Sequence, residues 1–130
     1  MKLDIWEAIS SLLDAGGKFE LHSYALRDRN GRLHREDGPA LVYSDGKQCW
    51  YHKGVRHRSD GPAITMLNGT QHWYRNGVLH RDDGPAVCLA DGTKFWYKDG
   101  MIHREDGPAV ILPDGKTSWY LNGKIYRAED

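Results

Sequence analysis

The sequence lacks any apolar run approaching the roughly 18 residues that a membrane-spanning helix needs, so we expect no membrane span. Asp4 and Glu7 interrupt the apolar N-terminal stretch, which argues against a secretory signal peptide. Only two cysteines are present, Cys49 and Cys88, and they lack the C-x-x-C spacing of a metal or redox motif. These absences predict a protein of the reducing cytoplasm.

The sequence also lacks an excess of charge and the motifs of catalysis. Eighteen basic residues balance eighteen acidic ones, so nothing marks a nucleic-acid-binding protein. No nucleophile elbow, phosphate-binding loop or H-E-x-x-H segment occurs. We therefore expect no enzyme activity, no catalytic residues, no bound metal and no cofactor, and we do not expect nucleic acid as a partner.

Glycine, by contrast, is abundant and regularly spaced. The chain has 15 glycines, and most belong to a 23-residue unit that reads approximately W-Y-x-N-G-x-L-H-R-x-D-G-P-A-V-x-x-x-D-G-x-x-x. The His-Arg pairs recur at this interval, at 34–35, 57–58, 80–81 and 103–104. The Trp-Tyr pairs keep the same interval, at 50–51, 73–74, 96–97 and 119–120. A repeat without insertions predicts a stack in which each unit contacts its neighbours.

Each unit carries two tight-turn signals, such as Asn68-Gly69 and Asn76-Gly77. Both signals favour two-residue type I′ hairpin turns, so each unit should contain two strands. A third reversal at Asp-Gly-Pro-Ala would break this parity, and we interpret that segment as a bend or bulge inside one long arm. In the third unit, the short strand spans 70–75 and the long arm spans 78–90. The first half of the arm should pair back onto the preceding Trp-Tyr strand and its second half forward onto the next.

The predicted fold is a single mainly-β domain over residues 1–130, a stack of antiparallel β-hairpins in one twisted sheet or solenoid. Residues 3–15 are predicted to form a short capping α-helix, because Asp4 and Glu7 form a capping box and Gly16-Gly17 supplies a stop. Residues 18–29 are predicted to contain a divergent first strand. Four repeats and a partial terminal unit follow over 30–127.

Period-two alternation assigns the faces of the sheet. One buried face is predicted to carry two apolar columns, Leu41, Ile64, Val87 and Val110 with Tyr43, Met66, Leu89 and Leu112. The tryptophans and the tyrosines are predicted to form ladders on opposite faces. Another repeat position has no common chemistry and is expected to be partly exposed, namely Cys49, His72, Phe95 and Ser118.

The His-Arg-x-Asp-Gly-Pro-Ala segment contains the residue types of metal sites, yet its spacing predicts a structural corner. Equivalent histidines should lie about 10 Å apart, since two strands separate them, whereas zinc ligands converge within about 2 Å of one ion. We expect each histidine to hydrogen-bond a turn carbonyl, and each aspartate to accept turn N–H groups while the arginine neutralises it. The predicted corner residues are His34, Arg35, Asp37, His57, Arg58, Asp60, His80, Arg81, Asp83, His103, Arg104 and Asp106.

The 23-residue unit, its N-G-x-x-H step and its later D-G turn resemble MORN repeats, the membrane occupation and recognition nexus motifs, over residues 30 to about 127. The MORN pattern has H-G-x-G where this chain has H-R-x-D-G-P-A. That variant is similar to repeats of uncharacterised bacterial, phage and large-virus proteins. The resemblance implies a hairpin stack with a non-catalytic scaffold or binding role, and it names no partner.

We expect the function to lie at exposed positions that differ between repeats. The predicted partner-binding residues are His52, Arg56, His72, Arg75, Phe95, Lys98 and Met101, because aromatic and arginine side chains are the usual interface anchors. The leading hypothesis is binding to another protein, for example by a phage or mobile-element inhibitor or adaptor of a host complex such as a CRISPR-type defence effector. That example rests on analogy. The alternatives are a self-assembling scaffold, including a homodimer through the C-terminal strand edge, and a nucleotide or glycan binder that uses the Trp and Tyr ladders.

Overall fold

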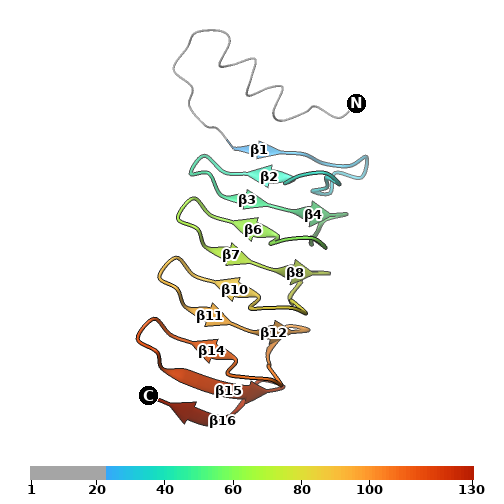
Figure 1. Cartoon of the computed structure of the whole chain (residues 1–130). Coiled ribbons are helices and arrows are strands. Elements are labelled where there is room, and N and C mark those ends of the chain that lie inside the picture. Colours follow the sequence, from blue (N-terminus) through green and yellow to red (C-terminus); the bar gives the residue numbers. More distant parts are fainter. Residues whose placement is uncertain (1–22) are drawn as a thin grey trace.

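The computed structural model describes residues 23–130, which form a stack of antiparallel β-hairpins (Figure 1). This arrangement confirms the predicted mainly-β hairpin stack. Most strands are short because each arm bends within its unit. The strands are β1 (Tyr24–Ala25), β2 (Leu41–Val42), β3 (Gln48–Cys49), β4 (Tyr51–His52), β5 (Val55–Arg56), β6 (Ile64–Thr65), β7 (Gln71–His72), β8 (Tyr74–Arg75), β9 (Val78–Leu79), β10 (Val87–Cys88), β11 (Lys94–Phe95), β12 (Tyr97–Lys98), β13 (Met101–Ile102), β14 (Val110–Ile111), β15 (Thr117–Leu121) and β16 (Lys124–Glu129).

Ten of these strands form one long sheet in the order β1-β2-β3-β6-β7-β10-β11-β14-β15-β16. Beside it stand three two-stranded hairpins, β4-β5, β8-β9 and β12-β13. The first half of each long arm pairs back as predicted, since β9 pairs with β8. The second half pairs on both sides, because β10 lies between β7 and β11. The sequence predicted the forward pairing of β10 with β11 but not its pairing back onto β7.

The two turns of each unit differ, although the sequence predicted type I′ for both. Lys53, Asn76, Asp99 and Asn122 have φ of 49 to 51° and each precedes a glycine with positive φ, as a type I′ turn requires. In the other turn only the glycine has positive φ, and the N–H of Gly46 donates to the Tyr43 carbonyl at 3.0 Å. The Asp45 carboxylate accepts the N–H of Lys47 at 3.0 Å. These features define a three-residue loop, stabilised by an aspartate that caps its own backbone.

The most buried residues are small. Ala40, Ala63, Ala86 and Ala109, the last residues of the Asp-Gly-Pro-Ala segments, are all 0% exposed. The N–H of Trp73 donates to the Ala86 carbonyl at 2.6 Å, which places the alanines in register with the tryptophans. In the first predicted column Ile64, Val87 and Val110 are buried, whereas Leu41 is half-buried. The second predicted column is not buried, because its members lie next to turns: Tyr43 is 38% exposed, and Met66, Leu89 and Leu112 are half-buried. Cys49, expected to be partly exposed, is fully buried.

The ends of the stack depart from the regular unit. The helix predicted over residues 3–15 lies outside the described residues. Within the predicted divergent region, β1 pairs with β2, and Arg27 forms an isolated bridge with Leu33. At the other end β15 and β16 form a long hairpin. Residues 23–130 contain no helix long and apolar enough to cross a membrane.

Candidate functional site

Each Asp-Gly-Pro-Ala corner folds over the tryptophan side of the sheet as a strap. We define the straps as residues 34–39, 57–62, 80–85 and 103–108. In the third strap, the Arg81 guanidinium lies 3.9 Å from the centre of the Trp73 ring. Its Nε donates to the Asp83 carboxylate at 3.0 Å and its Nη1 donates to the Pro85 carbonyl at 3.2 Å. The same contacts recur in the second and fourth straps, so each arginine ties its own corner to its own tryptophan.

The strap glycine makes room for the arginine. A Cβ placed on Gly84 would lie 2.9 Å from Arg81 Cζ, and the other strap glycines are equally crowded. None of the four has positive φ. The glycine therefore makes room for the close approach of the guanidinium, and it does not serve a left-handed backbone conformation.

The strap histidines join successive repeats. The N–H of Lys53 donates to His34 Nδ1 at 2.8 Å, and the N–H groups of Asn76, Asp99 and Asn122 donate in the same way to His57, His80 and His103. The sequence predicted a bond to a turn carbonyl. The structure instead makes each histidine an acceptor, because the first central residue of the type I′ turn points its N–H across the repeat boundary.

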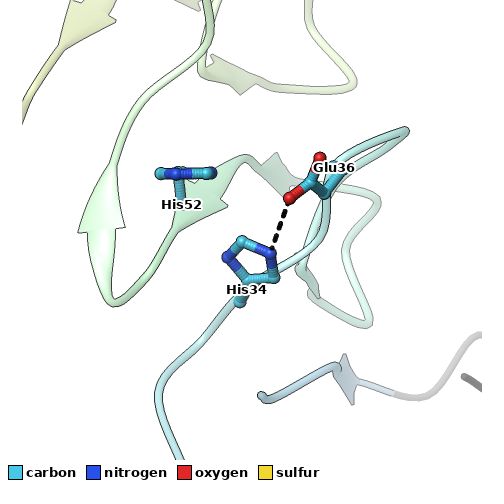
Figure 2. Close-up of side chains that lie close together, drawn as sticks. All are labelled: His34, Glu36 and His52. Carbon is cyan, nitrogen blue, oxygen red and sulfur yellow. Dashed lines mark ion pairs between the residues drawn. The ribbon is translucent and has the colours of Figure 1, made fainter. Parts of the chain in front are cut away.

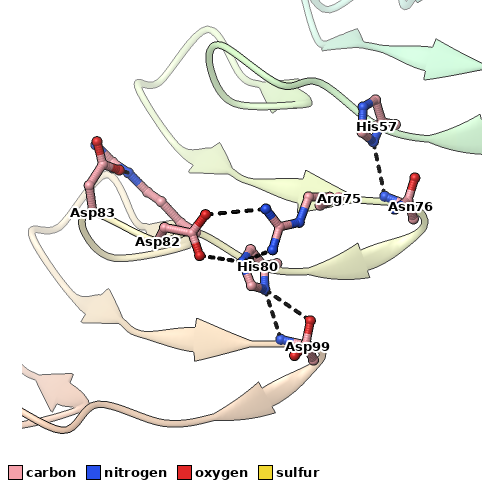
Figure 3. Close-up of polar contacts among 8 residues, drawn as sticks. His57, Arg75, Asn76, His80, Asp82, Asp83 and Asp99 are labelled. Atoms are coloured by element: carbon pink, nitrogen blue, oxygen red, sulfur yellow. Dashed lines mark hydrogen bonds and ion pairs between the residues drawn. The ribbon is translucent and has the colours of Figure 1, made fainter.

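This backbone donor sets the tautomer of each neutral imidazole. In a neutral imidazole that accepts at Nδ1, the proton is on Nε2. At His80, Nη2 of Arg75 also lies 2.5 Å from Nε2, so this nitrogen contacts both the guanidinium and Asp82. In three straps Nε2 faces a carboxylate, as in the 2.8 Å contact between His80 and Asp82 (Figure 3). The hydrogen bond from His80, together with the charge of Arg75, lowers the pKa of Asp82. The second strap has Ser59 at the position of that carboxylate.

One cluster has the composition of a metal site. The potential ligand atoms of His34, Glu36 and His52 lie within 4.8 Å of one another (Figure 2). However, His34 and Glu36 form the same pair as His80 with Asp82, and the Lys53 N–H leaves the proton of neutral His34 on Nε2. A metal ion at Nε2 would have to displace that proton and break the bond between repeats. These contacts account for His34 and Glu36 without an ion, and the His52 ring lies against that of His34 with their centres 4.9 Å apart.

Open clefts separate successive straps. Their volumes are about 410, 370 and 570 Å³ from the first to the last. Each cleft has a tryptophan at its base and strap carboxylates along its walls, and each contains a different basic side chain, His52, Arg75 or Lys98. A tryptophan and strap carboxylates are therefore present in every cleft, whereas the basic side chain differs from one cleft to the next.

The predicted contact residues divide between two faces of the sheet. The strap face, defined here as the side that carries the tryptophans and straps, includes His52, Arg75, Lys98 and Met101. The opposite tyrosine face includes Arg56, His72 and Phe95. Strand pairing opposes His52 to Val55 and Arg75 to Val78 on the strap face, whereas it opposes Tyr51 to Arg56 on the tyrosine face. The sequence therefore selected positions that do not form one surface.

Two residues of the strap face were missed by sequence reasoning. Val55 and Val78 are each 42% exposed, and Met101 at the same repeat position is 46% exposed. Side-chain atoms of Val55, Val78 and Met101 approach the turn glycine of the next repeat, so the three residues form a stripe across the repeats. The signal was a repeat position that is apolar in three units but lies at a hairpin tip.

No protein-family model matches the chain, and no curated protein matches it. The resemblance to MORN repeats therefore stays a prediction based on the repeat unit.

Proposed function

We propose that the protein is a non-catalytic β-repeat scaffold that binds another protein through its strap face. The observation that carries this proposal is the exposed apolar stripe of Val55, Val78 and Met101 beside the basic column of His52, Arg75 and Lys98. An apolar centre with a charged rim is the usual anatomy of a protein interface. The carboxylates of the straps form the outer side of that rim.

The charge pattern indicates how a partner would be held. Exposed strap carboxylates and the basic side chains of His52, Arg75 and Lys98 line the same clefts, so a partner with both signs of charge in a matching order would be selected over a uniformly charged polymer. Trp50, Trp73 and Trp96 are covered by the arginines of their own straps, and Trp119 is covered by Arg127 of the terminal hairpin. A nucleotide or glycan that stacked on them would first have to displace those guanidinium groups.

Photo-crosslinking from defined positions tests the proposal. A photoreactive phenylalanine analogue at Val78 or Met101 should give a discrete product with a partner, and the same analogue at Ile102 on the tyrosine face should not. Arg75→Ala combined with Lys98→Ala should weaken the Val78 product. Equal labelling from both faces, or no specific product from either strap-face position, would contradict the proposal.

As a biological setting we propose an inhibitor or adaptor of a host complex, such as a CRISPR-type defence effector, encoded by a phage or mobile element. This setting is an analogy that rests on a regular repeat frame whose exposed positions differ between units. Purified complexes of that class, added to the crosslinking experiment, test it directly.

Self-association is a second candidate. Strand β16 pairs only with β15 in the described part of the chain, and its Ile125 and Tyr126 are 54% and 55% exposed. An exposed edge strand is a template for pairing with a second copy. Light scattering should then show a dimer that Tyr126→Pro dissociates, and a monomer at high concentration would exclude this candidate.

A further inference from the structure

The tyrosine face contains one residue that breaks the pattern of the repeat. Along this face each tyrosine is opposed by a residue of the paired hairpin strand, as Tyr74 is by Leu79. The equivalent position is aliphatic in the other units, at Leu33, Leu79, Ile102 and Ile125. Only in the second unit is it charged, at Arg56. A charged side chain where the other units have an aliphatic one breaks the local pattern of the repeat.

The surroundings of Arg56 position its guanidinium and leave it incompletely bonded. The group lies between the rings of Tyr51 and Tyr74, at 5.6 and 5.1 Å from their centres. Its Nη2 donates to the Tyr51 hydroxyl at 3.1 Å, and its buried Nε has no hydrogen-bond partner. Among residues 23–130 Arg56 forms no ion pair, whereas every strap arginine has its aspartate. A buried donor left without a partner destabilises the fold.

The local field at this point of the face is positive. Burial, and then the charges of Lys47 and Arg56, lower the pKa of His72. Burial raises the pKa of the Cys49 thiol, while the same two cations act in the opposite direction. Cys49 and His72 both oppose Ile64 in the sheet, so the two groups lie on either side of one buried aliphatic side chain.

We propose that Arg56, held between Tyr51 and Tyr74 with Lys47 nearby, forms a binding site for a carboxylate carried on an apolar or aromatic body. The planar guanidinium matches a carboxylate in a two-point contact. The tyrosine rings on either side accept an apolar or aromatic group. A small, strongly hydrated anion such as inorganic phosphate gains nothing from those rings. The site is independent of the strap face and of its proposed partner.

The chain supplies a matched pair of test variants. Arg56→Leu introduces the residue found at the equivalent position Leu79, and Lys98→Leu introduces the residue found at the equivalent position Leu121. Titration calorimetry with 4-phenylbutyrate should show binding to the unchanged protein and to Lys98→Leu. Binding to Arg56→Leu should be weaker by tenfold or more. The corresponding amide and inorganic phosphate should bind at least tenfold more weakly than the carboxylate.

A second readout separates a binding role from a structural one. Bound carboxylate should shift the NMR titration midpoint of His72 upward, because a new negative charge favours the imidazolium. That shift should vanish in Arg56→Leu and be reduced in Arg56→Lys, which keeps the charge but loses the planar fork. The proposal is overturned if Arg56→Leu binds the carboxylate as well as the unchanged protein does, if the amide binds equally well, or if no ligand moves the His72 midpoint.

Discussion

The third strap and the terminal hairpin place the same arginine contacts on two different backbones. In the third unit the chain leaves the sheet after β9 and returns at β10. In the terminal hairpin β16 stays paired with β15 at five of its six residues, with a bulge at Tyr126, and Trp119 opposes Arg127. Arg127 nevertheless lies 4.4 Å from the Trp119 ring and pairs with Glu129. An arginine that packs on a tryptophan, with an acidic residue two positions later, is therefore not sufficient to form a strap.

The two regions differ at the histidine and the glycine of the motif. Tyr126 stands where the straps have histidine, so the bond that accepts a turn N–H from the next repeat has no equivalent. Asp130 stands where the straps have glycine, the position at which any Cβ would meet the guanidinium. The comparison indicates that the strap depends on room beneath the arginine and on a tie to the neighbouring repeat.

The largest effect is expected from a larger side chain in the column of buried alanines. Ala86→Leu adds three carbons to a site that is 0% exposed, so it should lower the free energy of unfolding by about 3 kcal/mol. Urea denaturation measures this change. Ala90→Leu, at an exposed position of the same arm, serves as the control and should stay within about 0.5 kcal/mol. Equal effects at the two positions would show that the alanine column is not a packed core.

The arginine comparison sharpens the distinction between strap and hairpin. Arg81→Ala should lower the free energy of unfolding by about 2 kcal/mol, because it removes the contact with Trp73 and two hydrogen bonds that hold the corner. Arg127→Ala should cost only about 0.5 kcal/mol, because its side chain is 55% exposed and its backbone remains in the ladder. Urea denaturation measures both changes. An equal loss of unfolding free energy in the two variants would contradict the distinction between strap and hairpin.

The glycine should couple to the arginine. Gly84→Ala is expected to cost about 1.5 kcal/mol, since the new Cβ would push the Arg81 guanidinium off Trp73. In an Arg81→Ala background the same change should lower the free energy of unfolding by less than about 0.5 kcal/mol, because the guanidinium that the new Cβ would contact is absent. A double-mutant cycle by thermal or urea unfolding measures the coupling. Additive effects would mean that the backbone, and not the guanidinium, requires glycine.

Removing a tie between repeats should have a smaller effect. His80→Phe keeps an aromatic ring at this position but loses the bond from the Asp99 N–H and the contact with Asp82, which should lower the free energy of unfolding by about 1 kcal/mol. Tyr126→Phe removes a polar group at the same repeat position from an exposed side chain and should be close to neutral. Hydrogen exchange of the Asp99 amide gives a local readout. Its protection should fall in His80→Phe, and unchanged protection would rule out the tie.

The smallest effect is expected from acid titration of a strap carboxylate. The hydrogen bond and charge of Arg58 lower the pKa of Asp60. A folded-state pKa below the unfolded value means that the contribution is complete above the unfolded pKa, about 3.9, and is lost as the pH falls through the folded pKa. Stability measured between pH 6 and pH 2.5 should therefore decline less in Asp60→Asn than in the unchanged protein. Parallel curves would show that the pair contributes nothing.

Regular features of the molecule could be predicted from the sequence because they depend on spacing. The 23-residue interval and the paired turn signals were enough to predict a stack of hairpins, and the arm that contains Val78 was correctly paired back onto β8. The Asn76-Gly77 turn was correct because both residues tolerate positive φ. The other turn was wrong, because Asp45 caps the backbone within its own loop and the sequence signal is the same for both.

The candidate site was only partly predictable. His52, Arg75 and Lys98 were selected because they vary, and they do line the clefts. Arg56 was selected for the same reason, yet it lies on the opposite face, because variability says nothing about which side of a sheet a residue occupies. Val55 and Val78 were missed, because an apolar residue type predicts burial. Their exposure follows from their place at a hairpin tip.

The sequence by itself determined the repeat, its turns and the alternation of faces, because these follow from glycine, from hairpin geometry and from period two along a strand. Only the tertiary structure decided what the His-Arg-x-Asp-Gly-Pro-Ala segment does. Its histidine meets a turn 19 residues further along the chain, and its arginine meets a tryptophan eight residues earlier, across the fold-back of the arm. Such contacts depend on how the arm is folded over the sheet, which local residue preferences do not specify.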